Sequence, residues 1–225
     1  MSPDSIATVP VSNPDPNWQA RHARNLGLSQ RSTEVLLLGD SITANWDAVP
    51  ATLRSSTGTT SVANFGIQGD RTEHILWRLQ SGEGAGTNPK AILLMIGTNN
   101  AGAGNQSEFD VFLGTQAVVG ELRRRFPEAR ILIQAILPRG AQASDPLRRE
   151  IAAANDLVIG LRDGQRVFVQ NFSRSFVAPN GTLRTNLFLP DMIHPNANGY
   201  AVWARAVKRN LALMRVGRNP VDIIR

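Results

Sequence analysis

Serine, histidine and aspartate occur in this chain at positions that together suit nucleophilic chemistry. Ser41 stands in Gly39-Asp40-Ser41 after an apolar segment, and His194 ends the segment Asp191-Met192-Ile193-His194. A serine hydroxyl becomes a good nucleophile only when a base removes its proton, and neutral imidazole is the natural base near neutral pH. An aspartate three residues before the histidine can orient the imidazole. These residues predict attack of Ser41 on an acyl carbon, with His194 as base and Asp191 as its partner.

Attack on an acyl group creates an oxyanion, which needs hydrogen-bond donors that are already in place. The candidate donors are the backbone N–H groups of Ser41 and Gly69 and the side-chain amide of Asn99. Glycine at position 69 permits a close approach of the backbone. Singly, each residue has an ordinary alternative, because serine and aspartate cap helices and asparagine favours turns. The ordered set of serine, glycine, asparagine and histidine is what favours catalysis.

Apolar segments alternate with helical patterns, which is typical of a doubly wound parallel sheet with helices on both faces. All strands of such a sheet end at one edge, where open α/β sheets bind ligands. Ser41, Gly69 and Asn99 are expected at this edge, with the loop of Asp191 and His194 folded over it. Strands are predicted over residues 35–38, 61–67, 91–96, 130–137 and 167–172, and a long polar loop over 173–190.

The 225 residues suit one domain, predicted over 17–215 between a mobile tail at 1–16 and a C-terminal tail at 216–225. No run of about 18 apolar residues is present, so no membrane span is expected. The first residues lack the basic start and apolar centre of a signal peptide. The chain has no cysteine, which excludes disulfides and thiolate metal sites and fits a cytoplasmic location.

The net charge of +6 comes from dispersed arginines, including Arg123-Arg124-Arg125 and Arg148-Arg149. Both clusters lie on predicted amphipathic helices without interleaved aromatic residues, so we expect them to form solvated helix faces. We expect no nucleic-acid partner. Neither a P-loop nor a GxGxxG motif follows the first strand, which argues against a nucleotide cofactor. No cluster of metal ligands is evident. We therefore expect neither a cofactor nor a metal.

Ser41, Gly69, Asn99 and His194 resemble, in type and order, the four residues that name the SGNH, or GDSL, hydrolase superfamily. A closer likeness, over about residues 18–205, is to the catalytic subunits of intracellular platelet-activating factor acetylhydrolase. The stretches that carry it include Asn64–Asp70, Ile75–Leu79, Gly97–Asn100 and Leu137–Gly140. The resemblance implies a flavodoxin-like three-layer α/β/α fold with a five-stranded parallel sheet, metal-free ester hydrolysis and a homodimer.

Two classes of function follow. The first is a serine esterase that cleaves short acyl, above all acetyl, esters of a small molecule, carbohydrate or lipid; a thioesterase or lysophospholipase belongs to the same class. The second is a non-catalytic binding or scaffold protein on the same fold, because fold does not fix function. In the acetylhydrolases that the chain resembles, aliphatic residues matching Ile42 and Ile193 help close the acyl pocket. Either isoleucine could instead pack into the core.

Overall fold

A parallel sheet forms the centre of the computed structural model, which describes residues 5–222. Its strand order is β2-β1-β3-β4-β5. The chain therefore winds outward from β1 in both directions, the flavodoxin-like arrangement in which ligands bind between the first and third strands. The fold class predicted from the sequence is confirmed. The strands are β1 (Val35–Gly39), β2 (Val62–Gly66), β3 (Ala91–Met95), β4 (Arg130–Gln134) and β5 (Val167–Gln170).

The central strands are continuous apolar runs because both of their faces are covered. All five residues of β1 and of β3 are buried, as expected for parallel strands between two layers of helices. The register pairs Gly39 at the end of β1 with Gly66 on β2 and with Met95 on β3. The carboxyl ends of these three strands therefore lie level with one another.

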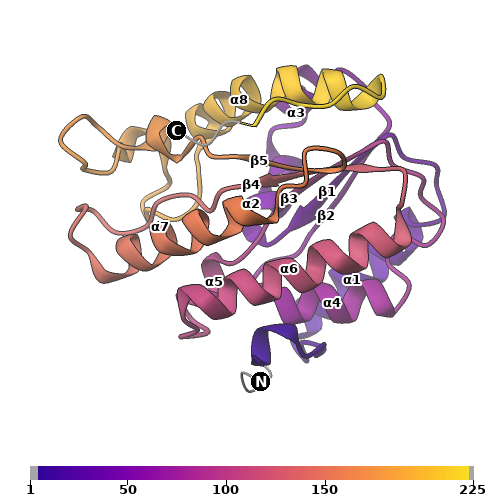
Figure 1. Ribbon diagram of the computed structural model, residues 1–225, viewed down its shortest axis with the longest axis horizontal. Helices are drawn as coiled ribbons and strands as arrows, with labels where there is room; N and C mark the ends of the chain where they lie inside the picture. The colour runs from indigo at the N-terminus through magenta and orange to yellow at the C-terminus, as the bar shows by residue number, and fades with distance from the viewer. Residues whose placement is uncertain (1–4, 223–225) are drawn as a thin grey trace.

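Helices cover both faces of the sheet (Figure 1). Val35 and Leu37 share one hydrophobic cluster with residues of α8. Leu36 and Leu38 point to the opposite face and share a cluster with residues of α4 and α6. This alternation along β1 produces three layers. One face carries α3 (Pro50–Thr57) and α8 (Ala197–Arg215), and the other carries α1 (Pro16–Leu28), α4 (Thr72–Gln80), α6 (Glu108–Arg125) and α7 (Pro146–Val158).

Two short helices begin directly beyond strand ends. The helix α2 (Ser41–Ala44) follows β1, and α5 (Thr98–Ala101) follows β3. They place Ser41 and Asn99 in first helical turns at the same edge of the sheet. Across residues 5–222, no helix is both long enough and apolar enough to cross a membrane.

The N-terminal segment makes defined contacts, whereas the sequence analysis predicted a mobile tail over residues 1–16. The 3-10 helix Ile6–Thr8 lies against α4 and α6. The Thr72 hydroxyl donates a hydrogen bond of 2.9 Å to the carbonyl oxygen of Ala7, whose side chain is buried. These contacts join Ala7 and its neighbours to α4 and α6. Residues 1–4 of the predicted tail lie outside the described residues.

The C-terminal segment also contacts the domain, although it contains no helix or strand through residue 222. The carboxylate of Asp222 accepts a hydrogen bond of 2.9 Å from the backbone N–H of Val169 on β5. This bond satisfies a donor on β5, the edge strand of the sheet formed by the described part of the chain. Residues 223–225 of the predicted tail are outside the described part of the chain.

The connection over residues 173–190 is polar in composition but buries several apolar side chains. Phe176, Leu187 and Phe188 enter the same hydrophobic cluster as α8. The rings of Phe176 and Phe188 pack edge to face at 5.4 Å. The sequence predicted a long polar loop here, and isolated apolar residues of this segment are buried where it crosses one face of the sheet. This packing supports the loop that carries His194.

Candidate active site

Ser41 is the first residue of α2, and its position is fixed by the turn that leaves β1. The Asp40 side chain caps this helix by accepting a hydrogen bond of 2.9 Å from the backbone N–H of Ile42. A Cβ on Gly39 would lie 2.2 Å from the carbonyl oxygen of Met95, so only glycine permits this close approach to β3. Ser41 is 9% exposed. The turn therefore holds a nearly buried hydroxyl at the carboxyl edge of the sheet.

His194 lies within hydrogen-bond distance of both partners predicted for it. Its Nε2 is 2.8 Å from the Ser41 Oγ, and its Nδ1 is 2.6 Å from the Asp191 Oδ2. Burial opposes ionisation of Asp191, but hydrogen bonds from the His194 ring and backbone and from the Ile193 backbone lower its pKa to about 2. An ionised Asp191 accepts a hydrogen bond from the Nδ1–H group, which leaves the Nε2 lone pair directed at the serine hydroxyl.

The loop that carries this pair is closed by backbone hydrogen bonds. The N–H of Leu189 donates to the carbonyl oxygen of His194 at 2.8 Å, and the N–H of Asn196 donates to Leu187 at 3.0 Å. Within the loop, the second oxygen of Asp191 accepts the N–H groups of Ile193 and His194. These hydrogen bonds position the imidazole without any contact to a substrate.

The oxyanion candidates lie on the same edge. The N–H of Ile67, just beyond β2, donates to the carbonyl oxygen of Gly39 at 3.1 Å and ties this turn to the nucleophile turn. Gly69 has φ +75°, which favours glycine. The Asn99 amide donates one hydrogen bond of 2.9 Å to the carbonyl oxygen of Asp70. An amide nitrogen carries two hydrogens, so this bond orients the amide and leaves the second hydrogen for a ligand.

A buried ionic cluster lies beneath the turn of Gly69. The Asp70 carboxylate accepts a hydrogen bond of 2.5 Å from the Trp18 indole and contacts the Arg78 guanidinium at 2.6 Å. Arg78 also contacts Glu83, and Glu83 lies 2.7 Å from the His22 ring. Asp70, Arg78 and Glu83 are fully buried. We call these three residues the Asp70–Arg78–Glu83 cluster; it holds the backbone that presents Gly69 and orients Asn99.

This cluster was not predicted from the sequence. In sequence, Asp70 with Glu73 three residues later resembles a capping box for α4. In the structure Arg71 occupies the capping position, and its backbone N–H donates to the His74 ring at 3.1 Å. Asp70 does not cap the helix, because its side chain is buried against Trp18 and Arg78. The signal that the sequence offered for this cluster is the position of Arg78 within the apolar segment Ile75–Leu79.

The other two histidines serve the scaffold. His22 pairs with Glu83 as described, and burial together with the charge of Arg71 lowers the pKa of His74 to about 4. His74 is therefore neutral near neutral pH and accepts the Arg71 N–H. Within residues 5–222, no group of three or more histidine, aspartate or glutamate side chains is arranged to hold a metal ion.

The two isoleucines proposed for the acyl pocket have different environments. Ile42 is 1% exposed and packs in the hydrophobic cluster with Trp46 and Tyr200. The Tyr200 hydroxyl donates to the Ile42 carbonyl oxygen at 2.7 Å. The side chain of Ile42 therefore offers almost no surface to a substrate. Ile193 is partly exposed beside His194, and a contact between its side chain and the acyl group stays a proposal.

Asp40 gives the domain a predicted dependence of stability on pH. Burial raises the pKa of Asp40 to about 7, although the Ile42 N–H and Arg139 lower it. The ordinary aspartate value is about 3.9. Between about pH 4 and pH 7 the folded chain thus holds a proton that the unfolded chain releases, so this contribution to stability falls as pH rises.

We therefore expect wild-type protein to lose more free energy of unfolding than Asp40→Asn does when the pH is raised from about 5 to about 7.5. Asparagine keeps the oxygen that caps α2 but cannot titrate. Urea denaturation of both proteins at each pH measures the difference. Equal losses in the two proteins would show that Asp40 does not hold this proton.

Comparison with known proteins shows the family of this chain. The sequence model of the GDSL-like lipase/acylhydrolase family matches residues 37–202, a range that includes Ser41 and His194. The chain belongs to this family. It is accordingly placed among the carboxylic ester hydrolases. The platelet-activating factor acetylhydrolase IB subunit alpha1 of Homo sapiens is 32% identical over 88% of this chain and 87% of its own length. The alpha2 subunit of Mus musculus is 33% identical over 83% and 80%.

Solved structures share the fold of this GDSL-family chain. A GDSL-like lipase from Bacteroides thetaiotaomicron superposes with a TM-score of 0.68 at 19% identity, over 87% of this chain and 97% of that one. A variant of an acetylxylan esterase from Geobacillus stearothermophilus gives 0.64 at 17% identity, over 81% and 96%. At such low identity these likenesses support the three-layer architecture alone.

Proposed function

We propose that the chain hydrolyses short-chain acyl esters, above all acetyl esters, with Ser41 as nucleophile, His194 as base and Asp191 as the residue that orients it. The proposal depends chiefly on the continuous contact from the Ser41 Oγ to the His194 Nε2, at 2.8 Å, and from Nδ1 to Asp191, at 2.6 Å. This arrangement supplies a base within reach of the hydroxyl proton and a carboxylate that fixes the ring.

The reaction proceeds in two halves. The Ser41 Oγ attacks the acyl carbon while its proton passes to the His194 Nε2, and the imidazolium then gives that proton to the departing alcohol. Water attacks the resulting acyl-serine, His194 takes the water proton, and Ser41 leaves with that proton as the carboxylic acid is released. Asp191 stays ionised throughout and stabilises the imidazolium. The N–H groups of Ser41 and Gly69 and the Asn99 amide would bind each oxyanion.

An acetyl preference is supported by the family relatives, since the human and mouse proteins are acetylhydrolase subunits. We expect kcat/KM to fall from p-nitrophenyl acetate through the butyrate to the octanoate, because Ile193 restricts the space beside the base. Each misplaced methylene should cost on the order of 1 kcal/mol. A preference for the octanoate would contradict a small acyl pocket, and no hydrolysis of any of the three would contradict the esterase proposal itself.

Asn99→Ala is expected to lower kcat for p-nitrophenyl acetate by about 10²–10³-fold with little change in KM, as for loss of one oxyanion donor. The reason is that the amide, held by the Asp70 carbonyl, meets its acceptor fully only when the oxyanion forms. Steady-state kinetics measures the two constants separately. If KM rose and kcat stayed constant, Asn99 would bind the substrate and not the transition state.

Other parts of the sequence interpretation remain proposals. A thioesterase or lysophospholipase uses the same acyl-enzyme chemistry, and the substrate panel would have to include such esters. A non-catalytic scaffold is disfavoured because every side chain of the proposed mechanism is present. A cytoplasmic location and a homodimer likewise stay predictions from the sequence.

A further inference from the structure

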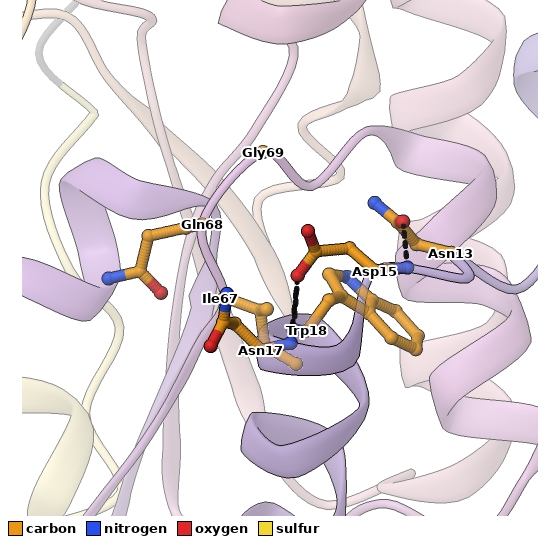
Figure 2. Close-up of a pocket in the computed structure, with 7 residues that line it drawn as sticks. All are labelled: Asn13, Asp15, Asn17, Trp18, Ile67, Gln68 and Gly69. Carbon is orange, nitrogen blue, oxygen red and sulfur yellow. Dashed lines mark hydrogen bonds between the residues drawn. The ribbon is translucent and has the colours of Figure 1, made fainter.

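A cavity of about 470 Å³ is lined in part by Gly69, a candidate donor of the proposed oxyanion hole (Figure 2). This shared residue is what connects the cavity to the proposed ester site. An acetyl group does not need this volume, which is within the range of small-molecule sites. On the proposed function, the occupant of the cavity is therefore the alcohol half of the ester. The residues lining it are Asn13, Asp15, Asn17, Trp18, Ile67, Gln68 and Gly69.

One wall of the cavity is built by the segment that leads into α1. The Asp15 carboxylate accepts hydrogen bonds from the N–H groups of Asn17, at 2.8 Å, and Trp18, at 3.0 Å. The side-chain oxygen of Asn13 accepts the Asp15 N–H at 3.0 Å, as Figure 2 shows. These bonds hold the wall in place before binding. The segment lies outside residues 37–202, so the cavity is not a feature of the matched family region alone.

The polar side chains that line the cavity indicate which kind of alcohol it could bind. Four of its side chains are amides or a carboxylate, and among residues 5–222 no lysine, arginine or histidine lines the cavity. The side chains of Asn17 and Gln68 make no hydrogen bond to any other residue within 5–222, which leaves them for a ligand or water. Trp18 is 2% exposed, so its ring offers little apolar surface. Amides and a carboxylate match hydroxyl groups, whereas Asp15 would repel a phosphate.

We propose that this cavity binds an uncharged, hydroxyl-rich alcohol half, such as a monosaccharide unit, and so directs the esterase toward acetylated carbohydrate. The inference rests on the proposed function. It assigns the part of the substrate beyond the acetyl group to residues 13–17 and to Gln68. A phospholipid headgroup is the alternative that the negative charge of Asp15 disfavours.

The test compares two acetyl esters of similar shape. In 6-O-acetylglucose and cyclohexylmethyl acetate, a six-membered ring bears a CH₂–O–acetyl group, and only the sugar carries hydroxyls. We expect the wild-type protein to hydrolyse the sugar ester with a kcat/KM at least about tenfold higher, because hydrogen-bonding sites reject analogues that lack the groups they bind. Acetate release measures both reactions, and p-nitrophenyl acetate reports esterase activity independently.

The double variant Asn17→Ala/Gln68→Ala should lower this preference by about tenfold, as loss of two ordinary hydrogen bonds predicts. The matched control is Asn88→Ala, which removes an exposed amide from a cavity of about 450 Å³ before β3, at the opposite end of the strands. The control should retain the wild-type preference.

Three results would overturn the inference: no wild-type preference for the sugar ester, a preference that the double variant retains, or an equal loss on both esters. If p-nitrophenyl acetate is cleaved in those cases, only the cavity assignment fails. If the wild-type protein cleaves none of the three esters, the proposed function fails and the inference fails with it.

Discussion

Ser41→Ala is expected to lower kcat for p-nitrophenyl acetate by at least about 10³-fold, as in other enzymes that lose the nucleophile of a triad. The Ser41 Oγ lies 2.8 Å from the His194 Nε2, and alanine leaves that base without a hydroxyl to activate. The fold should persist, because the Asp40 cap of α2 does not involve the Ser41 side chain. Steady-state kinetics with purified protein measures the loss.

A matched control for this variant is Ser175→Ala, because Ser175 is exposed and its side chain makes no hydrogen bond within residues 5–222. It should retain wild-type kcat. A Ser41→Ala protein that kept more than about a tenth of wild-type turnover would show that another group attacks the ester.

Arg78→Met is expected to lower the free energy of unfolding by about 3–5 kcal/mol, the usual result of removing one partner from a buried ion pair. Methionine has a similar length but no charge, so the carboxylates of Asp70 and Glu83 would stay buried without their cation. Both carboxylates contact Arg78, and all three side chains are fully buried. Urea denaturation monitored by tryptophan fluorescence measures the change.

Arg124→Met provides the comparison, because Arg124 pairs with Glu121 while its side chain is 67% exposed. Such surface pairs contribute about 0–1 kcal/mol. If the two variants lost similar amounts of stability, the Asp70–Arg78–Glu83 cluster would not stabilise the turn of Gly69 more than a surface ion pair does.

The candidate catalytic residues could be proposed from the sequence because each has a local signal and the parallel sheet brings their positions to one edge. Ser41 and Asn99 each follow an apolar strand. Their placement at one edge of the sheet could be predicted from the rule that parallel strands end at the same edge. Asp191 and His194 are three residues apart, so a single turn brings both together. The five strands were predictable for the same reason, since fully buried parallel strands are continuous apolar runs.

The missed features depend on contacts between distant residues. Asp70 has a helix-capping pattern in sequence, and only Trp18, 52 residues earlier, and Arg78 draw it inside. Ala7 is fixed by Thr72, 65 residues away. Ile42 adjoins the proposed nucleophile, Ser41, but neighbours in a helix point in different directions. Adjacency in sequence therefore did not reveal that its side chain packs into the core.

The central claim is that Ser41 carries the acyl group and that His194 activates it. The most direct measurement is mass spectrometry of the protein after reaction with a fluorophosphonate, followed by mapping of the modified peptide. We expect one adduct, located on Ser41, absent from Ser41→Ala and formed far more slowly in His194→Ala. An adduct on a different serine, or undiminished labelling of Ser41→Ala, would contradict the claim.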